Sequence, residues 1–344
     1  MSDILSNLAY LHGKPTAKAK LKAQAEHFVV KEDLGFELSG SGEHLMLRIR
    51  KTGENTSFVA NELAKFCGVK SKDVSWAGLK DRHAITEQWL SIHLPKSDDL
   101  NFDLFTKMHP SIEIVEQTRH NKKLRPGDLK GNFFELTLSE VTDVAAVDER
   151  LQVIATEGVP NYFGEQRFGN NGNNLDEARR WGRDNVRTRS QNKRSLYLST
   201  ARSWIFNHIV SVRLQQGCFD TPILGDVLSN QGSADVLLDS AMLESEAYSG
   251  AITAALAGDN ALPTTDAALE IEQVAVDAEP DLMALIRGNR MRHDRRVIKL
   301  LPETLSWECL ENAVVVKFWL DSGCFATSIM REVVEEIPFE RSFT

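Results

Sequence analysis

The segment SWAGLKDRHAITEQW, residues 75–89, places Asp81 between Lys80 and Arg82 in a glycine-containing turn between two strand-like runs. The two neighbouring cations favour the ionised form of the carboxylate, and their positive field attracts polyanions. This is a workable setting for a carboxylate nucleophile that acts on a nucleic acid. The alternative is an exposed charged triplet on a solvated turn, and the turn alone does not decide between the two.

The bulk composition bounds the class of protein. The chain has 344 residues, of which 42% are apolar, which suffices for a large core or for two domains. It contains no apolar run of about 18 residues that would predict a membrane span, and its start, MSDILSNLAY, lacks the pattern of a signal peptide. The four cysteines lie far apart without a zinc-binding spacing, which favours free thiols in a cytoplasmic protein: Cys67, Cys218, Cys309 and Cys324.

The charges are segregated along the chain. The net charge is −9, but residues 219–281 hold 13 acidic residues and no lysine or arginine, so the remainder carries a net charge of +4. Basic residues of that remainder form three clusters: Arg119, His120, Lys122, Lys123 and Arg125; Arg179, Arg180, Arg183, Arg187, Arg189, Lys193 and Arg194; and Arg287, Arg290, Arg292, Arg295, Arg296 and Lys299. This segregation suits an RNA ligand on one face and an acidic lobe that points away from it. Ordinary solvated helix faces are the alternative.

Hydrophobic periodicity divides the chain into strand-rich and helical parts. Residues 1–157 predict strands at 44–51, 88–94, 111–117 and 132–141, and an amphipathic helix at 57–69 with Ser57 as its N-cap. Residues 158–300 predict helices at 174–184, capped by Asn173 or Asn174, and at 200–217, ending at Gly217. We expect the acidic stretch to hold short elements on the surface.

The C-terminal segment returns to a strand at 313–320 and a helix at 326–337. These last 40 or so residues are too few to bury a core alone, so we expect them to join the sheet of residues 1–157. The helical middle is then an insertion.

Six further sequence motifs accompany the Asp81 segment along the chain: LHGKP (11–15), FVVKEDLGFE (28–37), GNFFEL (131–136), VPNYFGEQRFG (159–169), QNKRS (191–195) and SGCFATS (322–328). Together with GLKDRHA they resemble the TruD family of tRNA pseudouridine synthases over essentially the whole chain. The resemblance implies an α+β fold: a catalytic core (1–157 and 301–344) with a mixed, mostly antiparallel sheet flanked by helices, and a largely helical insertion domain (158–300). It places the RNA site between the two.

The resemblance also implies the reaction. The substrate would be the uridine at position 13 in the D arm of tRNA, converted to pseudouridine without a cofactor or metal, with Asp81 as the catalytic aspartate. The carboxylate either attacks the sugar or acts as the base of a glycal route, and the sequence does not separate these. We further expect no membrane association, no obligate protein partner and a monomer.

Other site residues follow from the same resemblance. Phe134 matches the position that stacks on the flipped base, Asn132 the substrate-binding asparagine, and Phe28 and Phe325 two substrate contacts. By pattern alone Phe134 shares a face with Leu136 and Leu138, which favours core packing, and Phe133 is the less favoured stacking candidate. Two cations complete the set: Lys22, which would pair with Asp81 or a phosphate, and Arg167, a candidate phosphate ligand.

Two other classes compete with this interpretation. A base-exchanging transglycosylase could also direct an aspartate at C1′, but it typically needs metal or cysteine sites that this pattern lacks. A non-catalytic tRNA chaperone would use the basic faces alone. Incubation with unmodified tRNA separates the three, because only an isomerase forms a new nucleoside of unchanged mass.

Overall fold

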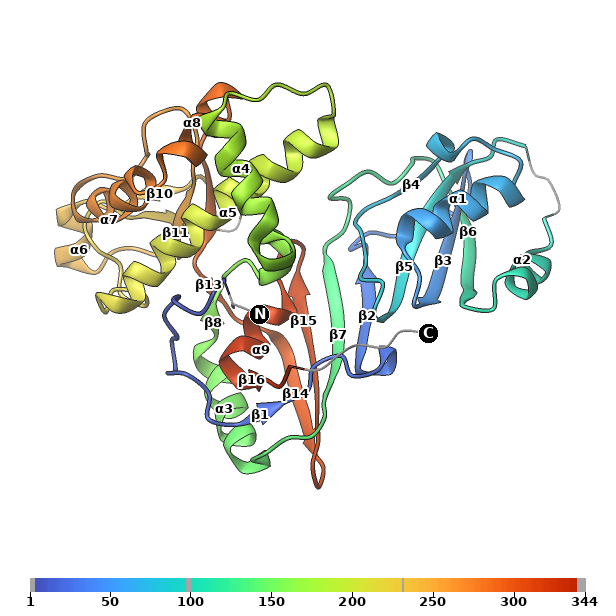
Figure 1. The fold of residues 1–344 in the computed structure, drawn as a ribbon, viewed down its shortest axis with the longest axis horizontal. Coiled ribbons are helices and arrows are strands. Elements are labelled where there is room, and N and C mark those ends of the chain that lie inside the picture. Colours follow the sequence, from blue (N-terminus) through green and yellow to red (C-terminus); the bar gives the residue numbers. More distant parts are fainter. Residues whose placement is uncertain (1–3, 97–99, 231, 339–344) are drawn as a thin grey trace. The chain divides into compact units, whose positions relative to one another are not determined.

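The computed structural model describes residues 4–96, 100–230 and 232–338, which pack into two compact units (Figure 1). The sheet unit comprises residues 16–155, 302–326 and 333–338. The middle unit comprises residues 4–15, 156–301 and 327–332. The segments 4–15 and 327–332 therefore pack with the middle of the chain, although the sequence analysis assigned them to the core. The predicted division into domains stays a prediction.

The sheet unit is built on an eight-stranded sheet in the order β14-β15-β7-β2-β5-β3-β6, with β4 paired to β5. The strands are β2 (Phe28–Asp33), β3 (His44–Thr52), β4 (Val74–Trp76), β5 (Ile85–His93), β6 (Ile112–His120), β7 (Gly131–Leu138), β14 (Glu303–Cys309) and β15 (Val314–Asp321). Only the β2–β5 pairing is parallel within this sheet of described residues. The C-terminal strands join the N-terminal sheet, so the predicted α+β class and the mixed, mostly antiparallel sheet are confirmed.

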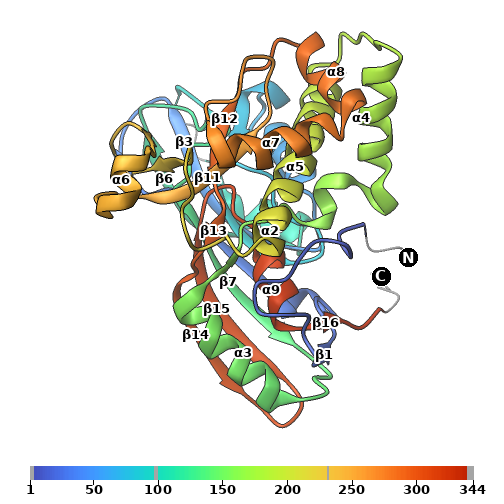
Figure 2. The same cartoon turned by 90° about the vertical axis from the view of Figure 1, so that its left-hand side faces the viewer.

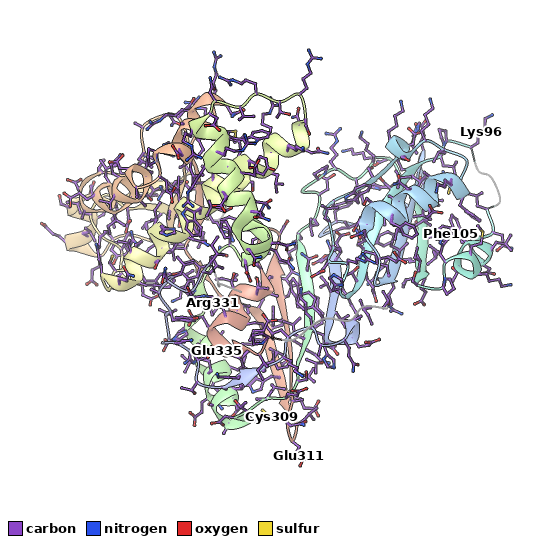
Figure 3. The ribbon with its side chains drawn as sticks, viewed as in Figure 1. Lys96, Phe105, Cys309, Glu311, Arg331 and Glu335 are labelled. Atoms are coloured by element: carbon purple, nitrogen blue, oxygen red, sulfur yellow. The ribbon has the colours of Figure 1, made fainter. Side chains whose placement is uncertain are left out.

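One face of this sheet carries the core of the unit. Leu47 and Ile49 on β3 alternate inward and pack with Val59 and Leu63 on α1 (Thr56–Phe66), which lies across these strands in Figure 1. Phe105 on α2 (Phe102–Met108), labelled in Figure 3, is fully buried in the same cluster. The alternation of apolar residues along β3 fixes which side chains face this core.

Two smaller features complete the sheet unit. Helix α3 (Val144–Glu157) lies beside the β14–β15 hairpin in Figure 2, and its Asp148 accepts a hydrogen bond of 2.6 Å from the indole of Trp307. Strand β1 (Lys18–Ala19) pairs in parallel with β16 (Glu335–Glu336). A short 3-10 turn, η1 (Ala25–His27), leads into β2, and a second, η2 (Ser71–Asp73), leads into β4.

The middle unit combines helices with a four-stranded sheet of order β10-β9-β11-β12. Its elements are β8 (Val159–Pro160), η3 (Glu165–Phe168), η4 (Asn170–Gly172), α4 (Asn173–Arg183), α5 (Gln191–Gln215), β9 (Val227–Ser229), β10 (Val236–Leu237), α6 (Ser240–Ser245), β11 (Ala251–Leu256), α7 (Asp266–Asp277), α8 (Pro280–Gly288), β12 (Asp294–Val297), β13 (Lys299–Leu300) and most of α9 (Ala326–Val333). Strand β13 pairs with β8.

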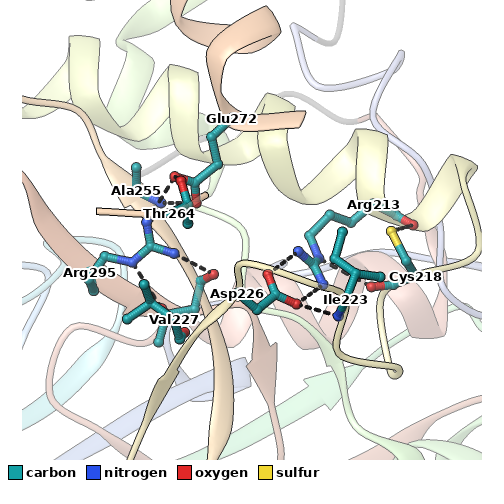
Figure 4. Close-up of polar contacts among 10 residues, drawn as sticks. Arg213, Cys218, Ile223, Asp226, Val227, Ala255, Thr264, Glu272 and Arg295 are labelled. Carbon is teal, nitrogen blue, oxygen red and sulfur yellow. Dashed lines mark hydrogen bonds and ion pairs between the residues drawn. The ribbon is translucent and has the colours of Figure 1, made fainter. Parts of the chain in front are cut away.

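Two buried ion pairs tie the middle unit together (Figure 4). Arg213 donates to both carboxylate oxygens of Asp226, at 2.7 and 2.9 Å, and both side chains are almost fully buried. Arg295 pairs with Glu272 and also donates to Thr253, while Glu272 accepts from Ala255 N and Thr264 Oγ1. Each buried charge thus has several partners, as interior charges require.

Element boundaries differ from the sequence predictions at places where local geometry decided them. The N-cap position of α1 is Asn55 and not Ser57, and its side chain makes no capping hydrogen bond. Helix α4 begins after Gly172, which has a left-handed conformation (φ 81°) that glycine adopts without strain. Helix α5 starts at Gln191, well before the predicted residue 200. The C-terminal helix ends at Val333, because residues 335–336 form a strand.

The prediction for the acidic stretch 219–281 is wrong in one respect. Strand β11 is buried, with Ile252, Thr253, Ala254 and Ala255 all shielded from solvent, and it forms the centre of the middle-unit sheet. Its small side chains allow α5 to pack closely on it. The stretch therefore contributes to a folded core, and two of its acidic residues, Asp226 and Glu272, are themselves buried there. In the part of the chain that the structure describes, no helix combines the length and the apolar character that a membrane crossing needs.

Candidate active site

Asp81 lies in the turn of residues 77–84 that connects β4 to β5. Its Oδ1 accepts a hydrogen bond of 2.9 Å from the backbone N–H of His83, two residues further along. Aspartate commonly bonds its own backbone in this way, and the bond fixes the orientation of the carboxylate. The side chain keeps 19% of its surface exposed, so the carboxylate is held but remains accessible.

Lys22 is the counter-ion of this carboxylate. Its Nζ lies 2.5 Å from Asp81 Oδ2, and its side chain is only 8% exposed. The backbone of Lys22 is left-handed (φ 56°), which costs a non-glycine residue about 1 kcal/mol or more. This conformation turns the lysine toward Asp81, and no sequence pattern signalled it.

A group of aromatic side chains packs against this ion pair. Lys22 Nζ lies 3.9 Å from the centre of the Phe28 ring, and Phe28 meets Phe134 edge-on at 6.1 Å. Phe134 stacks on Phe318 of β15 at 5.5 Å and is only 7% exposed. The structure thus brings together Asp81, Lys22, Phe28 and Phe134, while Phe134 itself is packed as a core residue.

Asn132 lies on the same strand and the same face as Phe134, opposite Glu32 of β2 and Leu320 of β15. Its Oδ1 is buried and has no hydrogen-bond partner among the described residues. A buried acceptor left unpaired costs about 1–3 kcal/mol, and the predicted contact of Asn132 with a substrate stays a prediction. Phe325 is half-buried just before α9, shortly after Asp321, which pairs with Gly131.

The cations that flank Asp81 in sequence have other partners. Lys80 Nζ pairs with Glu32 Oε1 at 2.8 Å, and Arg82 Nε donates to the carbonyl of Gly53 at 3.1 Å. The expected stabilisation of Asp81 by Lys80 and Arg82 therefore needs correction, because Lys80 is turned toward the buried carboxylate of Glu32. The direct counter-ion is Lys22.

The sequence analysis missed the buried polar residues beneath the turn, Glu32, Lys51, Thr56 and Gln88, which are each at most 7% exposed. A signal for two of them exists in the alternation of the strands. Lys51 continues the inward series of Leu45, Leu47 and Ile49, and Glu32 continues that of Phe28 and Val30. A charged residue at an inward position needs a partner, and here both partners belong to the turn.

Comparison with known proteins decides the family. The sequence matches the family model for tRNA pseudouridine synthase D (TruD) over residues 5–177 and 172–333. It is 67% identical to tRNA pseudouridine synthase D of Vibrio vulnificus over 348 residues, covering 100% of both chains. It is 66% identical to that of Vibrio cholerae over 346 residues, covering 100% of this chain and 96% of the other. The chain belongs to the TruD family.

A solved TruD structure from Methanosarcina mazei shares the fold, with a TM-score of 0.71 at 20% identity and 95% coverage of both chains. At this low identity the likeness concerns the fold alone. It agrees with the α+β architecture described above.

Arg167 lies in the middle unit of this TruD chain and is partly buried. It donates to Ser199 Oγ at 2.8 Å and its guanidinium lies 5.5 Å from the Phe163 ring. Burial lowers the pKa of the guanidinium. These contacts give Arg167 a structural function in the unit, and its predicted contact with phosphate remains a prediction.

The second basic cluster is partly neutralised within the middle unit. Arg179 binds Glu279 through two hydrogen bonds, Arg180 pairs with Glu177, and Arg183 pairs with Asp281. Six other cations are exposed and make no ion pair within the described residues: Arg187, Arg189, Lys193, Arg287, Arg290 and Arg292. Arg187 donates to the carbonyl of Gly288 at 3.1 Å, so the second and third clusters meet there. We call these six residues the basic patch.

An open groove of about 810 Å³ lies on the sheet unit, and Glu32, which binds Lys80 of the Asp81 turn, is part of its lining. Its lining includes the acidic residues Asp33, Glu37 and Glu116 together with Arg48 and Trp89, and Asp81 does not line it. The acidic lining disfavours a polyanion, so we place the chemistry at Asp81. Among the described residues, no group of three or more His, Cys, Asp or Glu side chains is arranged to hold a metal ion.

Proposed function

We propose that this protein converts uridine to pseudouridine in tRNA, at position 13 of the D arm, with Asp81 as the catalytic carboxylate. Membership of the TruD family supports the general activity. The observation that supports Asp81 is its close pairing with Lys22, next to the aromatic group of Phe28 and Phe134.

The reaction is an internal exchange of bonds. The N1–C1′ bond of uridine breaks, the uracil turns, a C5–C1′ bond forms, and the proton on C5 is lost while N1 gains one. Atoms and electrons balance within the nucleoside, so the chemistry needs no external oxidant or reductant. A carboxylate can attack C1′ directly or remove the proton from C2′ on a glycal route, and Asp81 is accessible enough for either.

Lys22 serves both routes. Paired with Asp81, its ammonium favours the ionised carboxylate, which is the reactive form. The pair is half-buried, so its electrostatic effect is stronger than that of a fully hydrated pair. The Phe28 ring beneath the ammonium holds the lysine side chain in place through a cation–π contact.

Base recognition follows from the remaining residues. A target uridine in folded tRNA is flipped out of its stack at a cost of a few kcal/mol, and stacking on an aromatic ring recovers about 1–3 kcal/mol. The half-buried Phe28, with Phe134 packed edge-on against it, offers such a surface. The amide of Asn132, on the same face of β7 as Phe134, would bond the uracil edge once its side chain turns, because its Oδ1 is buried in this structure.

The test is direct assay of unmodified tRNA. The wild-type protein should form pseudouridine at position 13 without a mass change and should leave a tRNA with cytidine at that position unmodified. Asp81→Asn should retain less than about one per cent of the activity, a barrier increase of at least about 2.7 kcal/mol. Asp103→Asn is the matched control, because Asp103 is an exposed aspartate at the start of α2 in the same unit.

Each outcome decides a different part of the proposal. Pseudouridine at another position would contradict the D-arm assignment alone, and an incorporated base of different mass would identify a transglycosylase. Activity of Asp81→Asn close to that of Asp103→Asn would remove Asp81 from the chemistry. Tight tRNA binding with no modified nucleoside would leave only the chaperone interpretation.

A further inference from the structure

Lys51 is a fully buried lysine directly beneath the Asp81 turn. It lies near the end of β3, and its side chain has no exposed surface. Its Nζ donates to two backbone carbonyls, those of Glu54 at 2.8 Å and Asp81 at 3.0 Å. Among the described residues it makes no ion pair with a carboxylate. Buried lysines are rare and costly, so this one calls for an explanation.

The rest of the turn is held from the same side. Glu32 of β2 binds Lys80 Nζ and also accepts the N–H of Trp89 at 2.8 Å. Thr56 Oγ1, at the start of α1, accepts the N–H of Lys80 at 3.2 Å and donates to Gln88 of β5. Side chains from four elements therefore fix the turn, and the contact of Lys51 is with the backbone of Asp81 itself.

The charges around Lys51 determine its protonation. Burial lowers its pKa most, the carboxylates of Asp81 and Glu54 raise it, and the ammonium of Lys80 lowers it, which leaves a pKa of about 8. Lys22 binds the carboxylate of Asp81, and Glu32 neutralises Lys80. At neutral pH, Lys51 is thus mostly charged, and it loses that charge under mildly alkaline conditions.

We propose that Lys51 is a positioning residue for the reaction of Asp81: its buried ammonium fixes the backbone of the turn and places a positive charge behind the carboxylate. The proposal rests on the function proposed above. Lys51 touches neither base nor sugar in this scheme and acts only through Asp81.

A consequence is that turnover depends on the charge of Lys51. A neutral amine retains two N–H groups and can still bond both carbonyls, but charge-assisted hydrogen bonds are roughly twice as strong as neutral ones. As the pH rises through about 8, the turn loosens and the carboxylate loses one of its two supporting charges. The chemical step should then slow, while tRNA binding, which involves many separate contacts, should not change.

The experiment measures the single-turnover rate on unmodified tRNA from about pH 7 to about pH 9, and the flat profiles expected of the Lys51 variants control for ionisation of uracil and guanine rings near the upper end. The wild-type rate should fall by up to about tenfold across this range, because the charged fraction of Lys51 falls about tenfold between one pH unit below its pKa and one unit above it. Lys51→Met should be about 10- to 100-fold slower at neutral pH, with a flat pH profile. Lys51→Arg, which keeps a permanent charge, should recover part of the rate and also remain flat.

Two controls separate positioning from general damage. Lys65→Met removes an exposed lysine from α1 of the same unit and should match the wild type throughout. The affinity of Asp81→Asn protein for tRNA, measured across the same pH range, should be constant. If Lys51→Met does not fold, the wild-type and Lys51→Arg profiles still test the proposal.

Three results would overturn it: a flat wild-type profile, a Lys51→Met rate within about threefold of the wild type, or an affinity loss as large as the rate loss. These results differ from failure of the proposed function. A wild-type protein that forms no pseudouridine at any pH contradicts the function itself, whereas an active wild type that is insensitive to Lys51 contradicts only this inference.

Discussion

The middle unit and the sheet unit both bury ion pairs, but they complete them differently. In the middle unit, Arg213 and Asp226 are 2% and 1% exposed and meet through two hydrogen bonds. In the sheet unit, Asp81 keeps 19% exposure beside a lysine of 8%. The first pair is closed to water, whereas the second leaves a carboxylate accessible. A completed pair specifies the fold, and an incomplete one is available for chemistry.

Breaking the closed pair should give the largest effect on stability. Asp226→Asn leaves Arg213 as an uncompensated buried charge, which should destabilise the protein by about 3–5 kcal/mol. Chemical denaturation of the isolated protein measures this loss. The same substitution at Asp81 should cost far less, because that site is partly hydrated and the amide still accepts from Lys22.

For activity, the contrast predicts the reverse order: Asp81→Asn should lower turnover far more than Asp226→Asn. At a temperature where Asp226→Asn remains folded, its turnover should stay near that of the wild type. Equal stability losses at Asp226 and Asp81 would show that exposure does not separate structural from reactive pairs in this protein.

The buried charge of Lys51 should make the stability of the protein pH-dependent. Its pKa of about 8 lies below the ordinary lysine value of 10.5, so the unfolded chain binds more protons between these two pH values. Stability attributable to Lys51 therefore rises with pH in this window, by about 3 kcal/mol in total. Below about pH 8 the full cost of burying the ammonium remains.

The difference between wild type and Lys51→Met measures this term, since the contributions of other groups cancel. Denaturation should show that the free energy of unfolding of the wild type increases relative to that of the variant as the pH rises from about 7 to about 10.5. The gain in stability coincides with the loss of turnover expected above. A constant difference across this window would mean that the pKa of Lys51 is not lowered in the folded protein, so that its ammonium stays charged up to the ordinary lysine value.

Phe134 tests whether a core residue can also serve the substrate. Because it is 7% exposed and stacked on Phe318, Phe134→Ala would lose about 3–5 kcal/mol of stability and obscure any stacking effect. Phe134→Leu conserves more volume and should cost less than about 1.5 kcal/mol. Loss of base stacking should nevertheless slow turnover by about 1–3 kcal/mol.

Phe318→Leu is the matched control, because it removes the stacked neighbour of Phe134 and leaves the proposed base contact in place. It should lower stability by a similar amount and change turnover less. Equal turnover in both leucine variants would assign Phe134 to the core alone.

The sequence predicted the sheet because alternating runs such as Leu45, Leu47 and Ile49 leave little choice of face. It placed Asp81 in a turn and identified Phe28 and Phe134, which the structure brings together. It did not reveal that Lys80 turns inward to Glu32, because a single charged residue in a turn is normally predicted to be exposed to solvent. The direction of Lys22 depends on one left-handed residue, which no periodicity encodes.

The middle unit was harder to predict for a related reason. The segment AITAAL has small side chains and a strongly acidic neighbourhood, which suggested surface elements. Its burial as β11 comes from long-range pairing with β9 and β12. Likewise, a run of arginines indicates charge, but only the fold shows which of them are neutralised by Glu177, Glu279 and Asp281.

The smallest effect is expected for the basic residues, and it separates paired from exposed arginines. If the basic patch binds the tRNA backbone, each phosphate contact contributes a slope of about 0.7–0.9 to the log–log dependence of affinity on salt. Arg189→Ala combined with Lys193→Ala should lower the slope by about 1–2. Arg179→Ala combined with Arg183→Ala should change it less, because Glu279 and Asp281 already neutralise these two side chains.

Titrations of tRNA at several salt concentrations give both slopes, and Asp235→Asn with Asp239→Asn controls for a change of net charge on the same unit. That acidic pair should leave the slope nearly unchanged. A larger effect of Arg179 and Arg183 would mean that RNA displaces their carboxylate partners on binding. A larger effect of the acidic pair than of either basic pair would assign the RNA contact to another face of the middle unit, because removing negative charge there would strengthen binding directly.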